Sequence, residues 1–199
     1  MAKKSILKRG FKANAERLAK KYREDLNIHP CSPLCAFELA KSFNITVYSI
    51  TDILSDPKDI EDLVGISENK SEWSALTMKT QQGNQIIIYN SFNSKARQQS
   101  DLMHELAHII CKHERRQTEY DAEIPFGMIS FEDVHEEEAR YLGATLQLAT
   151  PCLLWARNKS MSEEEISEYF NASIEMVRFR MNATGVVKRE FFKQRKSIQ

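Results

Sequence analysis

The chain has 199 residues, of which 42% are hydrophobic and 28% are charged, which is typical of a globular protein and excludes wholesale disorder. Its 28 basic residues balance its 28 acidic residues, so no overall charge points to nucleic acid. Because no apolar segment follows the basic N-terminus or is long enough to span a bilayer, we expect neither a secretory signal nor a membrane anchor. The 4 cysteines then indicate reduced thiols, which predicts a cytoplasmic protein.

The N-terminal quarter of the chain is expected to be helical apart from one strand. Apolar residues recur on one helical face between Ala15 and Leu26, which is typical of an amphipathic helix. Ser32 and Pro33 favour the start of a second helix, since serine caps a helix and proline suits its first turn. The Ile-Thr-Val-Tyr segment of residues 45–48 predicts a short strand.

A β-hairpin is predicted in the middle of the chain, after a polar connector with a helical turn over residues 52–70. Strand-like residues 73–80 and 85–89 flank the turn-forming sequence Gln-Gln-Gly-Asn of residues 81–84. The isoleucine run of residues 86–88 has the strongest β preference in the chain. This run could form a sheet edge to which an extended peptide adds, or it could be an ordinary core strand.

Helices dominate the C-terminal half. Two long helices are predicted over about residues 95–113 and 132–148, separated by a loop over 114–131 that contains proline and glycine. Thr150-Pro151 begins another helix. Residues 160–185 are patterned as two capped helices, which fits either a helix-turn-helix outline or a two-helix element that packs on the core.

The motif that carries chemistry is HELAH, at residues 104–108. Because His104 and His108 are four apart, they lie on one helical face and both imidazoles can reach a single ion. Glu105 lies about 100° around the helix, where it can face a water on the metal without binding the metal itself. Zinc lowers the pKa of such a water, and Glu105 would take its proton. A core helix that held these groups without a metal would bury costly polar atoms.

A catalytic zinc site usually has three protein ligands and one open position. Glu136 is the favoured third ligand because Glu136, Ala139 and Gly143 form one stripe on the next long helix. The two small residues of this stripe would let that helix approach the HELAH helix closely enough for the carboxylate to reach zinc.

Other polar residues near the motif are either alternative third ligands or expected to be solvated. His113, just beyond HELAH, and His135 could each take the place of Glu136 as third ligand. Glu137 and Glu138 lie elsewhere on the helical wheel, so we expect both to be solvated.

With these residues the chain resembles the ImmA/IrrE-type metallopeptidases. The pattern of that family is a strand, a helix with an HELGH-like motif, and then ExxANxFAxxLL followed by a proline. The matching segments here are residues 86–89, 104–108 and 136–147, with Pro151 after them. The resemblance covers roughly residues 10–185.

Two residues depart from the family pattern. Ala107 replaces the usual glycine, which is harmless in a helix. Arg140 stands where the family usually has asparagine, a residue that could orient a ligand histidine. An arginine cannot accept a hydrogen bond from an imidazole, so another acceptor is needed. Arg140 and Tyr141 are also the candidates for stabilising a developing oxyanion.

The resemblance implies an α+β fold, with a mainly helical zincin-like domain over residues 1–156, a small β-sheet, and a C-terminal helical, helix-turn-helix-like module over 157–199. It implies a zinc endopeptidase that uses Zn²⁺ as cofactor. Family members cleave or otherwise inactivate a helix-turn-helix repressor, and so release phage, mobile-element or stress genes. The expected partner is therefore such a protein.

Two other functions stay open. One is a DNA-associated regulator that binds through the C-terminal module and whose zinc site is structural or vestigial. The other is a zinc hydrolase that acts on a small molecule or a nucleic acid. Loss of function without Glu105 would separate the peptidase from the regulator, since only the peptidase needs a general base.

Overall fold

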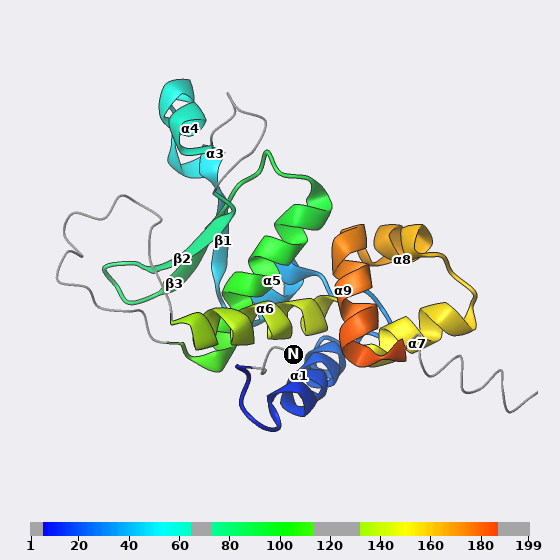
Figure 1. Cartoon of the computed structure of the whole chain (residues 1–199). Helices are drawn as coiled ribbons and strands as arrows, with labels where there is room; N and C mark the ends of the chain where they lie inside the picture. Colours follow the sequence, from blue (N-terminus) through cyan, green and yellow to red (C-terminus); the bar gives the residue numbers. More distant parts are fainter. Residues whose placement is uncertain (1–5, 65–72, 114–131, 187–199) are drawn as a thin grey trace, which may run out of the picture.

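The computed structural model describes residues 6–64, 73–113 and 132–186, which form a mainly helical α+β fold with a small sheet, as predicted (Figure 1). In chain order the elements are α1 (Phe11–Asp25), α2 (Ala36–Ser42), β1 (Thr46–Ser49), α3 (Ile50–Ile53), α4 (Pro57–Val64), β2 (Ala75–Lys79), β3 (Gln85–Tyr89), α5 (Lys95–Cys111), α6 (Asp133–Gln147), α7 (Thr150–Asn158), α8 (Glu163–Phe170) and α9 (Ile174–Thr184). The predicted loop over 114–131 and the basic end beyond Val187 lie outside the described residues. None of the described helices has the length and apolar character that crossing a membrane requires.

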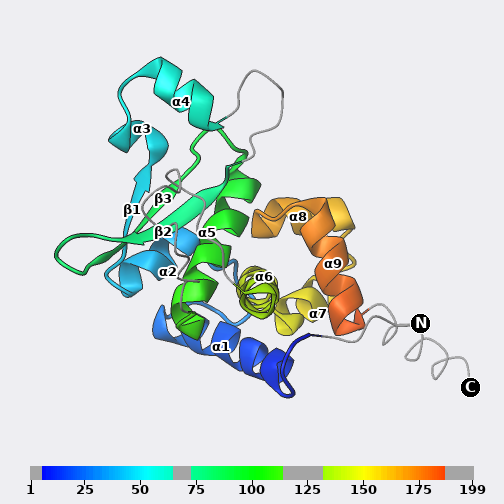
Figure 2. The same ribbon diagram turned by 60° about the vertical axis from the view of Figure 1, so that its left-hand side comes forward.

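Helix α6 lies at the centre of the helical part of the molecule. Figure 2 looks along it, with α1, α5, α7 and α9 arranged around it. Leu142 and Leu146 of α6 are fully buried, and their cluster extends to Ile166 of α8 and Val177 of α9. The two helices near the C-terminus therefore share the main hydrophobic core.

Helices α5 and α6 approach each other closely at Gly143. A Cβ atom added there would lie 3.0 Å from the carbonyl oxygen of Met103 and 3.1 Å from the backbone nitrogen of His104. Ala139, one turn earlier, is fully buried. The small-residue stripe thus brings the two backbones together, as its spacing predicted.

The sheet has the strand order β1-β3-β2, with β1 parallel and β2 antiparallel to β3. The predicted hairpin is therefore present. The isoleucine run of β3 is central, and its interpretation as an edge strand is wrong. Ile87 faces the main core, whereas Ile88 packs into a second cluster with Leu76 and Ile50 on the opposite face. Burial on both faces explains the uninterrupted apolar run. The strand order places β2 at one edge of the described sheet.

Two of the helix starts that the sequence indicates are capped by a serine side chain. Ser94 begins α5 and accepts a hydrogen bond from the backbone of Arg97, while Ser162 begins α8 with a capping box. The helix start expected at Ser32 is wrong, because α2 begins at Ala36. The carbonyl of Ser32 instead accepts a hydrogen bond from the buried Arg23 at 3.0 Å, so a tertiary contact holds this segment outside the helix.

Candidate metal centre

Three polar side chains from two neighbouring helices meet at one point. His104 and His108 stand one turn apart on α5, and Glu136 lies in the first turn of α6. The Nε2 atoms of the two histidines are 3.1 Å apart. Glu136 places one carboxylate oxygen 3.2 Å from Nε2 of His104 and the other 3.6 Å from Nε2 of His108. Among the described residues, these three form the group that could hold a metal ion.

The geometry of this group fits zinc. In a tetrahedral site with bonds of about 2.0–2.1 Å, neighbouring donor atoms lie about 3.3–3.4 Å apart. The three separations measured here, 3.1, 3.2 and 3.6 Å, lie around that value. Two imidazole nitrogens and one carboxylate are also the donor types that catalytic zinc takes, with a fourth position left for water or substrate.

Burial and charge differ between the three side chains. The His108 side chain is 3% exposed, whereas those of His104 and Glu136 are 32% and 46% exposed, so the group opens to solvent on one side. Burial and the adjacent His104 lower the pKa of His108 to about 3, which keeps its imidazole neutral and able to donate a lone pair. The hydrogen bond with His104 holds the pKa of Glu136 below its usual value, so the carboxylate is charged.

His104 behaves differently from His108. Burial by itself lowers the pKa of His104, but the hydrogen bond to Glu136 and the charges of Glu105 and Glu136 outweigh it, so the pKa lies above its usual value. A metal that binds His104 must therefore displace its proton, so metal affinity at this residue should increase as the pH rises.

Glu105 lies beside this group and is held by a residue of the sheet. The Oγ1 hydroxyl of Thr77, on the edge strand β2, donates a hydrogen bond to Oε2 of Glu105 at 2.6 Å. Burial raises the pKa of Glu105, and the bond from Thr77 opposes that rise. Sequence reasoning missed Thr77, which stands 28 positions before Glu105 and belongs to no motif.

The two histidines considered as alternative ligands lie behind the group. Nδ1 of His113 is 3.0 Å from Nδ1 of His108, on the side of that ring away from Glu136. His135 stacks on His113 with ring centroids 4.4 Å apart. Glu138, expected to be solvated, is 5% exposed, and this expectation is wrong. Its Oε2 lies 3.1 Å from Nε2 of His113, a partner that helical spacing alone could not reveal.

Neither candidate for oxyanion stabilisation is placed with these residues. Arg140 pairs with Glu137 at 2.7 Å and lies over the ring of Phe179 in α9. Tyr141 is buried against Phe11 of α1 and beneath the guanidinium of Arg180. Both side chains therefore serve contacts between helices.

Comparison with known proteins gives one family match and a distant structural likeness. The family model described as IrrE N-terminal-like domain, a peptidase family, matches residues 63–182. No curated protein matches the chain. Among solved structures, a Mycobacterium tuberculosis transcriptional regulator is similar with a TM-score of 0.48 and 11% identity over 88% of this chain. The match takes in 47% of the regulator, so this chain spans about half its length.

Proposed function

The chain belongs to the family of IrrE N-terminal-like domains, and on that premise we propose that it is a zinc-dependent endopeptidase. The observation that carries this proposal is the meeting of His104, His108 and Glu136 beside the buried Glu105. These residues provide three ligands, an open fourth position and a base, which is the set that metal-assisted hydrolysis needs.

His104, His108 and Glu136 would hold the ion, and zinc so held supplies a Lewis acid that lowers the pKa of water and polarises a carbonyl. Glu105 takes the proton from the attacking water and then delivers it to the leaving amine. Its raised pKa brings the carboxylate closer to the working pH, which favours a group that must both accept and release a proton. Thr77 fixes the orientation of this carboxylate through its hydroxyl.

The position of β2 supports a peptide as substrate. This strand is an edge of the described sheet, and its Thr77 contacts Glu105. An extended peptide that adds to an edge strand gains main-chain hydrogen bonds. Such an addition would bring a peptide bond close to the proposed base, whereas a small molecule would need no strand.

A helix-turn-helix repressor as the substrate follows from the family pattern of the sequence. Cleavage of a repressor would release the genes that it controls. All four cysteines are free thiols, which supports the proposal that the protein works in the reducing cytoplasm.

The test is cleavage of a repressor encoded beside this protein, followed by gel electrophoresis and mass spectrometry. We expect the wild-type protein with one equivalent of zinc to cleave it, and a chelator to stop the reaction. Glu105→Gln removes the base but no ligand, so zinc and fold should persist while cleavage falls by about 10²–10⁴-fold or more.

The control is Glu61→Gln, an exposed carboxylate on α4, which should cleave like wild type. Regulatory activity that survives Glu105→Gln would contradict the peptidase and favour a DNA-associated regulator with a structural zinc. Zinc-dependent hydrolysis of small esters or nucleic acid with no peptide cleavage would favour the other hydrolase.

A further inference from the structure

A chain of buried polar side chains extends from His108 away from the candidate metal centre. Nδ1 of His108 faces Nδ1 of His113 at 3.0 Å, and Nε2 of His113 faces Oε2 of Glu138 at 3.1 Å. The side chains of His108, His113 and Glu138 are only 3%, 4% and 6% exposed. Beyond them, Nζ of Lys8 lies 3.7 Å from the second carboxylate oxygen of Glu138.

The positions of the protons in this row of side chains follow from His108, which would bind the metal. A histidine that binds a metal through Nε2 carries its proton on Nδ1. Nδ1–H of His108 then donates to Nδ1 of His113, which must be unprotonated to accept. His113 therefore carries its own proton on Nε2, and this N–H donates to the carboxylate of Glu138, which only accepts. Each of these ring nitrogens then has one role, and no donor faces another donor.

We propose that His113 and Glu138 are positioning residues that fix the ring orientation and the tautomer of His108 for metal binding. The proposal rests on the zinc site of the proposed function and adds two residues that do not touch the ion. Groups that accept a hydrogen bond from a ligand histidine raise its basicity and hold its ring in place.

Neighbouring residues hold the row of His108, His113 and Glu138, here called the relay, in position. His135 stacks on His113 with an interplanar angle of 13°, which restricts rotation of the His113 ring. Glu136 and Glu138 both belong to α6, so one helix supplies a ligand on one side of His108 and the end of the relay on the other. The acceptor that Arg140 cannot provide thus comes from His113, while Arg140 pairs with Glu137.

The test compares zinc affinities, measured by competition with a chromophoric chelator, of wild type and two variants at His113. His113→Gln keeps an amide oxygen that can accept from His108, whereas His113→Met fills a similar volume and offers only the weak acceptor of a thioether. We expect His113→Met to weaken zinc binding by about 10–100-fold. His113→Gln should recover most of that loss, and Glu138→Gln should lie between the two. Lys112→Gln, which changes an exposed neighbour, should bind zinc like wild type.

A spectroscopic reading separates positioning from a general effect on folding. In zinc-loaded protein with ¹⁵N-labelled histidine, the Nδ1–H signal of His108 should be protected from exchange in wild type and His113→Gln, and should exchange faster in His113→Met. Equal zinc affinities for His113→Met and His113→Gln in folded protein would overturn the proposal while leaving the zinc site intact. A wild-type protein that binds no zinc would overturn the proposed function together with this inference.

Discussion

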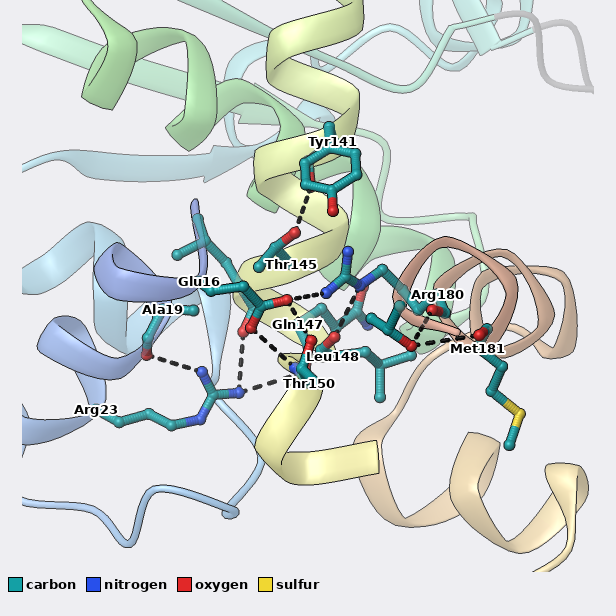
Figure 3. Close-up of polar contacts among 12 residues, drawn as sticks. Glu16, Ala19, Arg23, Tyr141, Thr145, Gln147, Leu148, Thr150, Arg180 and Met181 are labelled. Atoms are coloured by element: carbon teal, nitrogen blue, oxygen red, sulfur yellow. Dashed lines mark hydrogen bonds and ion pairs between the residues drawn. The ribbon is translucent and has the colours of Figure 1, made fainter. Parts of the chain in front are cut away.

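Helix α6 carries a polar cluster at each end, and the two clusters differ in how their charges are satisfied. At the N-terminal end, Glu136 and the two histidines of α5 direct their donor atoms at a common point that is open to solvent. At the C-terminal end, Arg23 and Arg180 are fully buried, and Arg23 donates a hydrogen bond to the carbonyl of Leu146. Arg180 donates one to the carbonyl of Leu148 (Figure 3).

Glu16 completes the C-terminal cluster. It accepts a hydrogen bond from Nη2 of Arg180 at 2.7 Å and two more from the backbone and hydroxyl of Thr150, at 2.9 and 2.6 Å. Positive side chains at the end of α6 and a carboxylate in its first turn both complement the helix dipole. The C-terminal cluster ties α1, α7 and α9 to α6, and of its buried polar atoms Nη1 of Arg180 has no hydrogen-bond partner among the described residues. The N-terminal cluster instead directs its donor atoms at one point that could hold an ion. The two clusters therefore differ in the direction of their donor atoms, which converge on one point only at the N-terminal end of α6.

The largest effect on stability is expected at the C-terminal cluster. Arg180→Met removes the charged partner of Glu16, which keeps its bonds from Thr150, and the donor to the carbonyl of Leu148, so we expect the free energy of unfolding to fall by about 3 kcal/mol. Urea denaturation measures this change, and zinc stoichiometry of the folded protein should stay the same. Arg178→Met, two residues away, removes an exposed pair with Glu163 and should change stability little. Equal losses in both variants would contradict a special role for Arg180.

At the N-terminal cluster the expected effect is on the affinity for zinc. Glu136→Gln removes a charged ligand and should weaken zinc binding by more than the roughly 100-fold upper range for residues that only support a ligand. Glu137→Gln, the next residue on the same helix, should bind zinc like wild type, because Glu137 pairs with Arg140. Chelator competition gives both affinities. If Glu137→Gln loses zinc and Glu136→Gln keeps it, the helical register assigned to the site is wrong.

A smaller effect is expected where α5 and α6 touch, between the two clusters. Alanine is favoured over glycine in a helix by about 1 kcal/mol, so helix propensity alone predicts that Gly143→Ala stabilises the protein. The added Cβ would meet the backbone of Met103 and His104 at 3.0–3.1 Å, and forcing apart a packed contact costs about 1–3 kcal/mol. We therefore expect a lower unfolding midpoint and weaker zinc binding. A higher midpoint would mean that the helices separate at little cost.

The smallest effect concerns the pH dependence of cleavage. The hydroxyl of Thr77 favours the charged form of Glu105 and lowers its pKa, so Thr77→Val should raise that pKa further. Because a protonated Glu105 cannot act as a base, the acidic limb of kcat/KM should move to higher pH. Thr46→Val, an exposed threonine on β1, should leave the limb where it is. An unchanged limb in Thr77→Val would show that this hydrogen bond does not tune the base.

The packing of α8 and α9 shows how residues 160–185 contribute to the fold. The periodicity of residues 160–185 fits both a helix-turn-helix outline and a packing element. Ile166, Val177 and Arg180 are fully buried against the rest of the protein, so these helices cover the core. Recognition of a partner through their exposed faces stays a prediction, and so does the division of the chain at residue 156.

Local patterns were sufficient for much of the fold and of the candidate site. The capping box at Ser162 and the hairpin around Gly83 depend on neighbours within a few residues, and both were predicted. HELAH encodes its own geometry, because four residues along a helix return a side chain to the same face. The small-residue stripe ending at Gly143 selected Glu136 for the same reason.

The sequence by itself determined the hairpin, the two long helices, the two ligand histidines proposed here and the helix that supplies a carboxylate, since each follows from spacing within a short stretch of chain. It did not determine the start of α2 or the helix α4, which lies within the expected connector. Only the tertiary structure decided which strand is an edge, which hydroxyl holds Glu105, and that Glu138 is buried beside His113 rather than solvated. Each of these depends on pairing between segments that are far apart in the chain or separated by a loop. Periodicity specifies the direction in which a side chain leaves its own helix or strand, but the partner that it meets there is fixed by how the elements pack.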